Sequence, residues 1–174
     1  MTMELFADNE LDVFYSAEDA ARAKRKRLEN IIKILPWIAQ IDAFQHWIYA
    51  HPTHSRAERT AKWLELDTGF GAVVDWSGYQ ENRESTWQRQ LHLFVHPFYY
   101  IEYGIAQLGA LQLWLRFKRD RKEALHGYRT ALELGGSRPL PELFEAAGAR
   151  FDFSAETIQP LVDAVQDELA TLPA

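Results

Sequence analysis

The sequence predicts an all-α fold, an irregular bundle of about seven helices in one domain over residues 1–174. Three observations predict it. Apolar residues recur at helical spacing through most of the chain, and nowhere do four or more alternating residues make a convincing strand. No linker, fixed-period repeat or low-complexity tract divides the chain, and its length suffices for one domain with a core.

A long basic helix is predicted to start after Ser16. Ser16 is a suitable N-cap, and the acidic residues Glu18 and Asp19 lie in the first turn, where they suit the helix dipole. Pro36 interrupts this helix, so residues 37–48 form either a second helix or a kinked continuation. The expected apolar face consists of Leu28, Ile31, Ile32 and Leu35.

The middle of the chain alternates between helical and irregular stretches. Thr53 or Ser55 can cap a helix that runs to about Leu66. Glycines punctuate residues 67–83, the least regular stretch, and a short helix is expected over 84–94.

Four more helices are predicted in the second half of the chain. One begins at Pro97 and is apolar nearly all round, so we expect it to be the buried central helix. Three more are expected over residues 122–134, 140–147 and 154–172. Together these elements make the all-α bundle.

Composition excludes several classes of function. Nineteen basic and 25 acidic residues give a net charge of −6, which argues against a nucleic-acid partner. The basic runs 22–27 and 116–122 are nucleic-acid patches or, as the charge favours, exposed helix surfaces paired with acidic residues. The absence of cysteine removes disulfides, thiol nucleophiles and Cys-type metal sites. With no signal peptide or membrane-spanning run, we expect a cytoplasmic protein without a membrane partner.

Metal-ligand patterns are sparse. The His-Glu-x-x-His motif of zinc peptidases is absent. Glu123-Ala-Leu-His126 matches half of a di-iron pattern, which would need a second copy and two further glutamates. A solvated helix face is the favoured interpretation of Glu123 and His126, and a metal-binding bundle is the weaker one.

The segment from His92 to Tyr103 carries the most informative chemistry. Tyr99 and Tyr103 are four residues apart, so they share one face if they lie on a helix, and His92 lies just before that helix. Two phenols and an imidazole can donate hydrogen bonds to an oxyanion or a peptide carbonyl, but they offer no nucleophile. Chemistry alone favours the other interpretation, in which these are buried aromatic residues with satisfied hydroxyl groups.

Six stretches extend this signal almost from end to end. They are Met1–Phe6, Leu35–Ala39, Ile41–Tyr49, Trp87–His92, Pro97–Ala110 and Gly135–Phe144. On these stretches the chain resembles the C-terminal part of the oligoendopeptidase F branch of the thimet-oligopeptidase-like zinc metallopeptidases. The resemblance implies part of an all-α catalytic domain that closes over a channel for short peptides.

The resemblance also implies where the metal is bound. Zinc is the cofactor of the complete family enzyme, held by a His-Glu-x-x-His helix and a later Glu. That Glu precedes a segment that Met3, Glu4 and Leu5 match here, so we expect the chain to begin just after the last ligand and to contain no metal ligand or cofactor of its own.

By the same resemblance, His92, Tyr99 and Tyr103 match catalytic residues that bind substrate and stabilise the tetrahedral intermediate. Tyr100 and His96 are expected to bind substrate. A third tyrosine of the thimet branch corresponds to Ala106 here.

The sequence therefore predicts a C-terminal fragment of a zinc metalloendopeptidase that hydrolyses short peptides and is inactive alone. Its expected partners are short peptides and either an N-terminal half-protein or further copies of itself. The alternative is a free-standing helical module that binds peptides or proteins and has lost catalysis.

Overall fold

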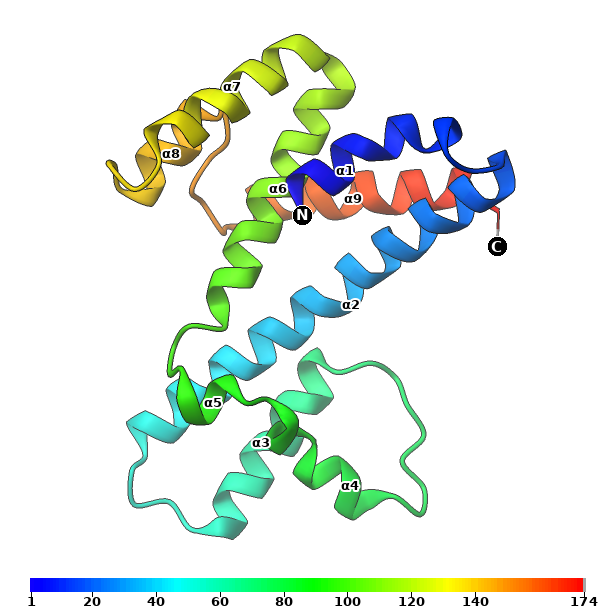
Figure 1. The fold of residues 1–174 in the computed structure, drawn as a ribbon. Helices are drawn as coiled ribbons and strands as arrows, with labels where there is room; N and C mark the ends of the chain where they lie inside the picture. The colour runs from blue at the N-terminus through cyan, green and yellow to red at the C-terminus, as the bar shows by residue number, and fades with distance from the viewer. Residues whose placement is uncertain (174) are drawn as a thin grey trace. The chain divides into compact units, whose positions relative to one another are not determined.

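A computed structural model describes residues 1–173, and it confirms the all-α class (Figure 1). Those residues contain nine α-helices, two 3-10 helices and no β-strand. The elements are α1 (Thr2–Ala7), η1 (Asp8–Val13), α2 (Ala17–Ala50), α3 (Arg56–Phe70), α4 (Gln80–Ser85), η2 (Thr86–Arg89), α5 (His92–Val95), α6 (Ile101–Arg119), α7 (Arg121–Leu134), α8 (Leu140–Ala146) and α9 (Ala155–Thr171). Within the described residues, none of these helices is long and apolar enough to cross a membrane.

Contacts along the chain group into two compact units. The first unit contains residues 1–31 and the chain from Ile105 onward, and the second contains Ile32–Gly104. One boundary falls inside α2 and the other inside α6, so each of these helices contributes turns to both units. The expectation of a single domain stays a prediction.

The core of the second unit is aromatic. Ile41 and Phe44 of α2 and Trp63 of α3 are fully buried. The Phe44 and Trp63 rings meet edge to face with centroids 5.1 Å apart. The Trp63 indole N–H donates to the carbonyl of Arg83 and to the hydroxyl of Thr86, both at 3.0 Å, and so ties the 80–89 segment to the core. Each such buried side chain stabilises the fold by roughly 1.5–3 kcal/mol.

A capping box fixes the start of α3. The Ser55 hydroxyl accepts from the Glu58 N–H at 3.2 Å, and the Glu58 carboxylate accepts from the Ser55 N–H at 2.8 Å. Of the two predicted caps, Ser55 is therefore the N-cap and Thr53 lies outside the helix.

The first unit packs short helices against α6. Phe6 of α1 stacks on Phe117 of α6 with centroids 4.3 Å apart, and meets Tyr128 of α7 edge to face at 5.8 Å. Lys118 of α6 forms an ion pair with Glu168 of α9. The middle of α6 is buried as expected, through Ala110, Leu111, Leu113, Trp114 and Phe117. Helix α1 was not predicted, because six residues are too few to show a period.

Helix α2 continues through Pro36 as one helix of 34 residues. Leu28 before the proline and Ile38 after it are buried, and this packing outweighs the backbone hydrogen bond that Pro36 cannot donate. Ile32 is 40% exposed, so it does not share the buried face that its spacing predicted.

Candidate functional site

A tight turn between α5 and α6 shapes the candidate site. Phe98 adopts a left-handed backbone conformation with φ of 60°, which costs a bulky residue about 1–2 kcal/mol. Its N–H donates to the side-chain carbonyl of Gln45 at 3.0 Å, and Gln45 is only 2% exposed. The Phe98 ring packs against His46 and Tyr49 of α2, with centroids 5.0 and 4.8 Å apart. These contacts hold the strained turn in place.

Because of this turn, α6 begins at Ile101 and not at Pro97, where the sequence predicted its start. The carbonyl of Tyr99 accepts from the N–H of Glu102 at 3.0 Å, so Tyr99 stands at the entrance of the helix and Tyr103 in its first turn. Tyr99 therefore lies before the helix and does not share a helical face with Tyr103, contrary to what the spacing of the two residues predicted. The turn nevertheless brings the Tyr99 and Tyr103 rings together, edge to face at 5.9 Å.

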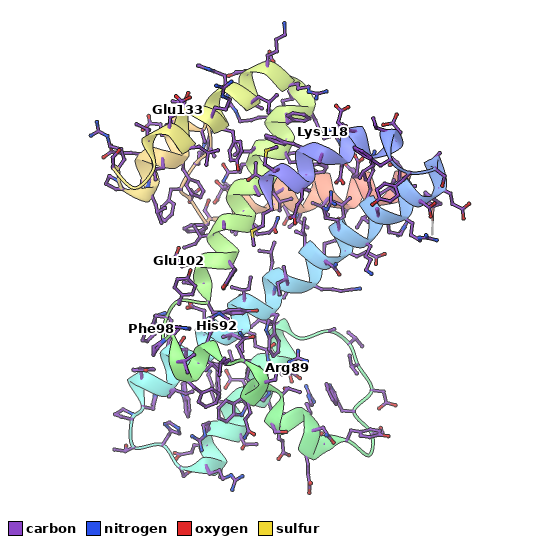
Figure 2. The ribbon with its side chains drawn as sticks, in the orientation of Figure 1. Arg89, His92, Phe98, Glu102, Lys118 and Glu133 are labelled. Atoms are coloured by element: carbon purple, nitrogen blue, oxygen red, sulfur yellow. The ribbon has the colours of Figure 1, made fainter. Side chains whose placement is uncertain are left out.

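All five side chains selected from the sequence come together around His92, and they are called the His92 cluster here. The His92 ring lies at the first residue of α5, which Figure 2 labels. Its centroid is 6.1 Å from His96, 6.3 Å from Tyr99, 4.9 Å from Tyr100 and 5.6 Å from Tyr103. Tyr99 is 52% and Tyr103 37% exposed, so part of the cluster is open to solvent.

A line of polar contacts runs into the cluster from α2. The indole Nε1 of Trp37 lies 3.1 Å from Oε1 of Gln90, and Nε2 of Gln90 lies 2.7 Å from Nδ1 of His92. On the other side of the ring, Nε2 of His92 lies 3.5 Å from the hydroxyl oxygen of Tyr103. Neither Gln90 nor Trp37 was predicted from the sequence to belong to the site, because no sequence spacing links two residues that are 53 positions apart.

Burial disfavours the ionised form of one phenol in the cluster. The pKa of Tyr100 is raised above its ordinary value, chiefly because burial disfavours the phenolate, while a hydrogen bond with the Trp37 side chain acts in the opposite direction. Burial therefore favours the neutral hydroxyl of Tyr100 over its phenolate.

The Trp37 ring is itself held from several sides. The guanidinium of Arg89 lies over its face, 4.4 Å from the ring centroid. Trp63 meets it edge to face at 5.8 Å, which connects it to the buried core of the second unit. The polar line therefore starts from a fixed side chain.

Across residues 1–173, no group of three or more His, Asp or Glu side chains is placed to hold a metal. The Glu123 carboxylate of the half di-iron pattern pairs with Arg116 at 2.6 Å. The His92 cluster brings together imidazole and phenol groups that can form hydrogen bonds.

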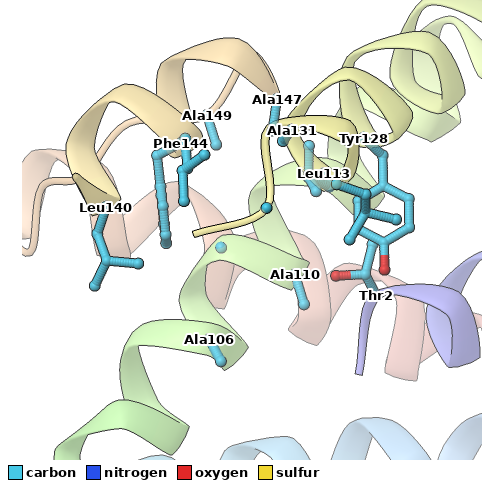
Figure 3. Close-up of a pocket in the computed structure, with 14 residues that line it drawn as sticks. Thr2, Ala106, Ala110, Leu113, Tyr128, Ala131, Leu140, Phe144, Ala147 and Ala149 are labelled. Atoms are coloured by element: carbon cyan, nitrogen blue, oxygen red, sulfur yellow. The ribbon is translucent and has the colours of Figure 1, made fainter. Parts of the chain in front are cut away.

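The first unit holds an apolar pocket of about 320 Å³ (Figure 3). Leu113 of α6, Tyr128 of α7 and Phe144 of α8 contribute large side chains, and much of the remaining lining is alanine and glycine. The lining contains no charged residue and no histidine. The pocket therefore offers mainly apolar burial, with the Tyr128 phenol as its one titratable group.

Comparison with protein families gives one assignment. A sequence model described as peptidase family M3 matches residues 1–162. No curated protein matches the chain.

Solved structures show the same fold. PZ peptidase A, solved with an inhibitor, is similar at a TM-score of 0.87 and 32% identity over 98% of this chain and 30% of its own. A protein named as an oligoendopeptidase F gives a TM-score of 0.83 with the same identity and coverage. Another so named, from Bacillus anthracis strain Ames, gives 0.76 and 27% identity over 98% of this chain and 27% of its own. The chain thus spans about 30% of the length of these structures.

Proposed function

The chain belongs to peptidase family M3, and we propose that it supplies the substrate-binding wall of a zinc metalloendopeptidase of the oligoendopeptidase F type that hydrolyses short peptides. The observation that carries this proposal is the convergence of His92 and Tyr103, whose Nε2 and hydroxyl oxygen lie 3.5 Å apart. The similarity to structures named as oligoendopeptidase F supports the peptidase class.

The spacing of the two groups suits one shared acceptor. An oxygen atom about 2.9 Å from each of two donors that are 3.5 Å apart accepts a hydrogen bond from both. A peptide carbonyl oxygen becomes more negative as its carbon turns tetrahedral, so these bonds strengthen in the transition state. His92 and Tyr103 would then stabilise the reacting oxygen rather than attack the peptide.

The rest of the His92 cluster suits substrate binding. The Tyr99 ring lies parallel to His92, with an interplanar angle of 3°, and half of it is exposed. Burial raises the pKa of the Tyr100 phenol, which favours its neutral hydroxyl form. Together with His96, they provide ring faces and hydrogen-bonding groups for a short extended peptide.

We propose that zinc and the general base come from polypeptide outside these 174 residues. The chain contains no His-Glu-x-x-His sequence, and its described residues include no group of three or more His, Asp or Glu side chains placed to hold a metal. The chain alone is then expected to bind a short peptide without hydrolysing it.

An assay on the purified chain tests this proposal. A short quenched-fluorescence peptide is incubated with the chain and zinc, with and without a chelator, and its binding is measured by calorimetry. We expect saturable binding and no turnover. Chelator-sensitive turnover that both His92→Ala and Tyr103→Phe abolish would contradict the inactivity, and absence of any binding would contradict the substrate-binding role.

A second candidate function is a binding module that has lost catalysis. Leu91, Phe94 and Val95 beside His92 are more than half exposed, which favours a contact surface. One experiment distinguishes the two candidate functions. The chain is mixed with an N-terminal polypeptide that contains the His-Glu-x-x-His segment of a family M3 enzyme, and peptide turnover and association are measured. Restored turnover supports the peptidase, whereas association without turnover supports the module.

A further inference from the structure

We infer that Gln90 and Trp37 are positioning residues that fix His92 as the neutral tautomer with its proton on Nε2. This inference rests on the proposed function, because it explains how His92 and Tyr103 can both donate to one substrate oxygen. It rests on the polar line Trp37–Gln90–His92 and on the hydrogen-bonding capacity of each group.

The orientation of the Gln90 amide follows from Trp37. An indole N–H can only donate, so the Gln90 atom 3.1 Å from it must be the carbonyl oxygen. Exchanging the oxygen and nitrogen of the amide would set two donors against each other. The Gln90 NH₂ group therefore faces His92.

The tautomer of His92 follows from Gln90. An amide NH₂ can only donate, and it lies 2.7 Å from Nδ1 of His92. Nδ1 must therefore carry a lone pair, and the single proton of the neutral ring is on Nε2. Both the Nδ1–H tautomer and the imidazolium would place an N–H against the Gln90 NH₂ group.

This tautomer keeps the Tyr103 proton available. If Nε2 carried the lone pair, the hydroxyl of Tyr103, 3.5 Å away, would donate to His92 and its proton would be used within the cluster. With the proton on Nε2, Tyr103 cannot donate to His92. In the free chain the Nε2–H of His92 faces the oxygen of Tyr103. A substrate oxygen that lies near both groups can accept from this N–H and from the Tyr103 hydroxyl, so only small movements of the two protons are needed.

Contacts with Arg89 and with the buried core fix the position of the Trp37 ring. Its ring lies under the Arg89 guanidinium and against the buried Trp63, so its N–H has a fixed direction. The indole N–H thus reaches His92 through Gln90, and it also forms a hydrogen bond with Tyr100. Neither Trp37 nor Gln90 needs to touch the substrate.

Nitrogen-15 NMR of the histidine rings in the full 174-residue chain tests the inference. Spectra are recorded at pH 9 without peptide, and the His92 signals are identified by their loss in His92→Gln. We expect the Nε2–H pattern in the wild type. Gln90→Glu replaces the donor by a carboxylate of similar shape, so His92 should change to the Nδ1–H pattern. Gln88→Glu makes the same chemical change at an exposed position two residues away, and should leave the pattern unchanged.

Peptide affinity at the same pH is the second measurement. The neutral Nδ1–H ring presents an acceptor at Nε2, so Gln90→Glu should weaken binding of the short peptide about tenfold, and Gln88→Glu should not. If Gln90→Glu does not fold, Trp37→Phe replaces it, because loss of the indole N–H frees the amide and should populate the Nδ1–H tautomer.

A wild-type Nδ1–H pattern, or an unchanged Nε2–H pattern in the folded variant, overturns the inference. These outcomes separate it from the proposed function. A chain that binds peptide with an Nδ1–H ring contradicts the inference alone, whereas an Nε2–H ring in a chain without peptide binding contradicts the proposed function alone.

Discussion

Nε2 of His92 lies 3.5 Å from the hydroxyl oxygen of Tyr103, although the two residues belong to different helices. The contact exists because the chain turns sharply at Phe98, where φ is 60°. A continuous helix from His92 to Tyr103 would place the two residues about three turns apart, which is about 16 Å along its axis. The strained turn therefore creates the candidate site.

Substitution of Gly148 is expected to destabilise the first unit. Gly148 has φ of +77°, and an added Cβ would lie 2.5 Å from the guanidinium carbon of Arg116. Gly148→Ala should reduce the free energy of unfolding by about 2 kcal/mol, since the left-handed conformation alone costs 1–2 kcal/mol. Gly136→Ala is the control, because nothing lies within 4 Å of its added Cβ. Equal urea midpoints for the two variants would refute this expectation.

The capping box of α3 should contribute measurably to stability. Ser55→Ala removes the hydroxyl that accepts from the Glu58 N–H, and should lower the free energy of unfolding by about 1 kcal/mol. Thr53→Ala, in the exposed turn before the helix, should have little effect. Thermal unfolding of both variants checks this, and a larger loss for Thr53→Ala would show that the cap is misassigned.

The same box should make stability depend on pH. Hydrogen bonds from the Ser55 N–H and hydroxyl lower the pKa of Glu58 below its ordinary value. Because the folded-state pKa is the lower one, this contribution is complete above the ordinary Glu pKa of about 4.3 and is lost as pH falls through the folded-state pKa. Urea unfolding of wild type and Glu58→Gln between pH 3 and 7 measures it. The stability difference should shrink at low pH, and a constant difference would contradict the assignment.

We propose that the purified chain self-associates through the exposed apolar residues beside the His92 cluster. Leu91 is 64% exposed, and burying a leucine at an interface contributes roughly 1.5–3 kcal/mol. Leu91→Ser should therefore weaken association at least tenfold in light scattering over a dilution series. Leu132→Ser changes a similarly exposed leucine of α7 and should not. A wild-type mass that equals the monomer at every concentration contradicts the proposal.

The long helices were predictable because their apolar positions repeat and their caps are local. Helices α3 and α7 lie close to their predicted ranges, and Ser55 forms the predicted cap. The predicted helix over 84–94 is instead α4, η2 and α5, since the contacts of Trp63 with Arg83 and Thr86 shape this segment. Such contacts leave no period in the sequence.

The residues of the candidate site lie close together in the sequence, whereas the contacts that hold them join distant positions. His92, His96, Tyr99, Tyr100 and Tyr103 lie within 12 consecutive residues, and the sequence selected all five. Gln90 reaches Trp37, and Phe98 reaches Gln45, each across 53 positions. Only the fold shows these long-range hydrogen bonds.

A double-mutant cycle on peptide binding tests most directly whether His92 and Tyr103 act on one substrate oxygen. Calorimetry with one short peptide compares wild type, His92→Gln, Tyr103→Phe and the double variant, with exposed His126→Gln and Tyr79→Phe as the control pair. We expect about tenfold weaker binding for each single variant and a coupling energy of at least about 0.5 kcal/mol, because both donors share one acceptor. Wild-type affinity in both single variants, or strictly additive losses, would contradict this expectation.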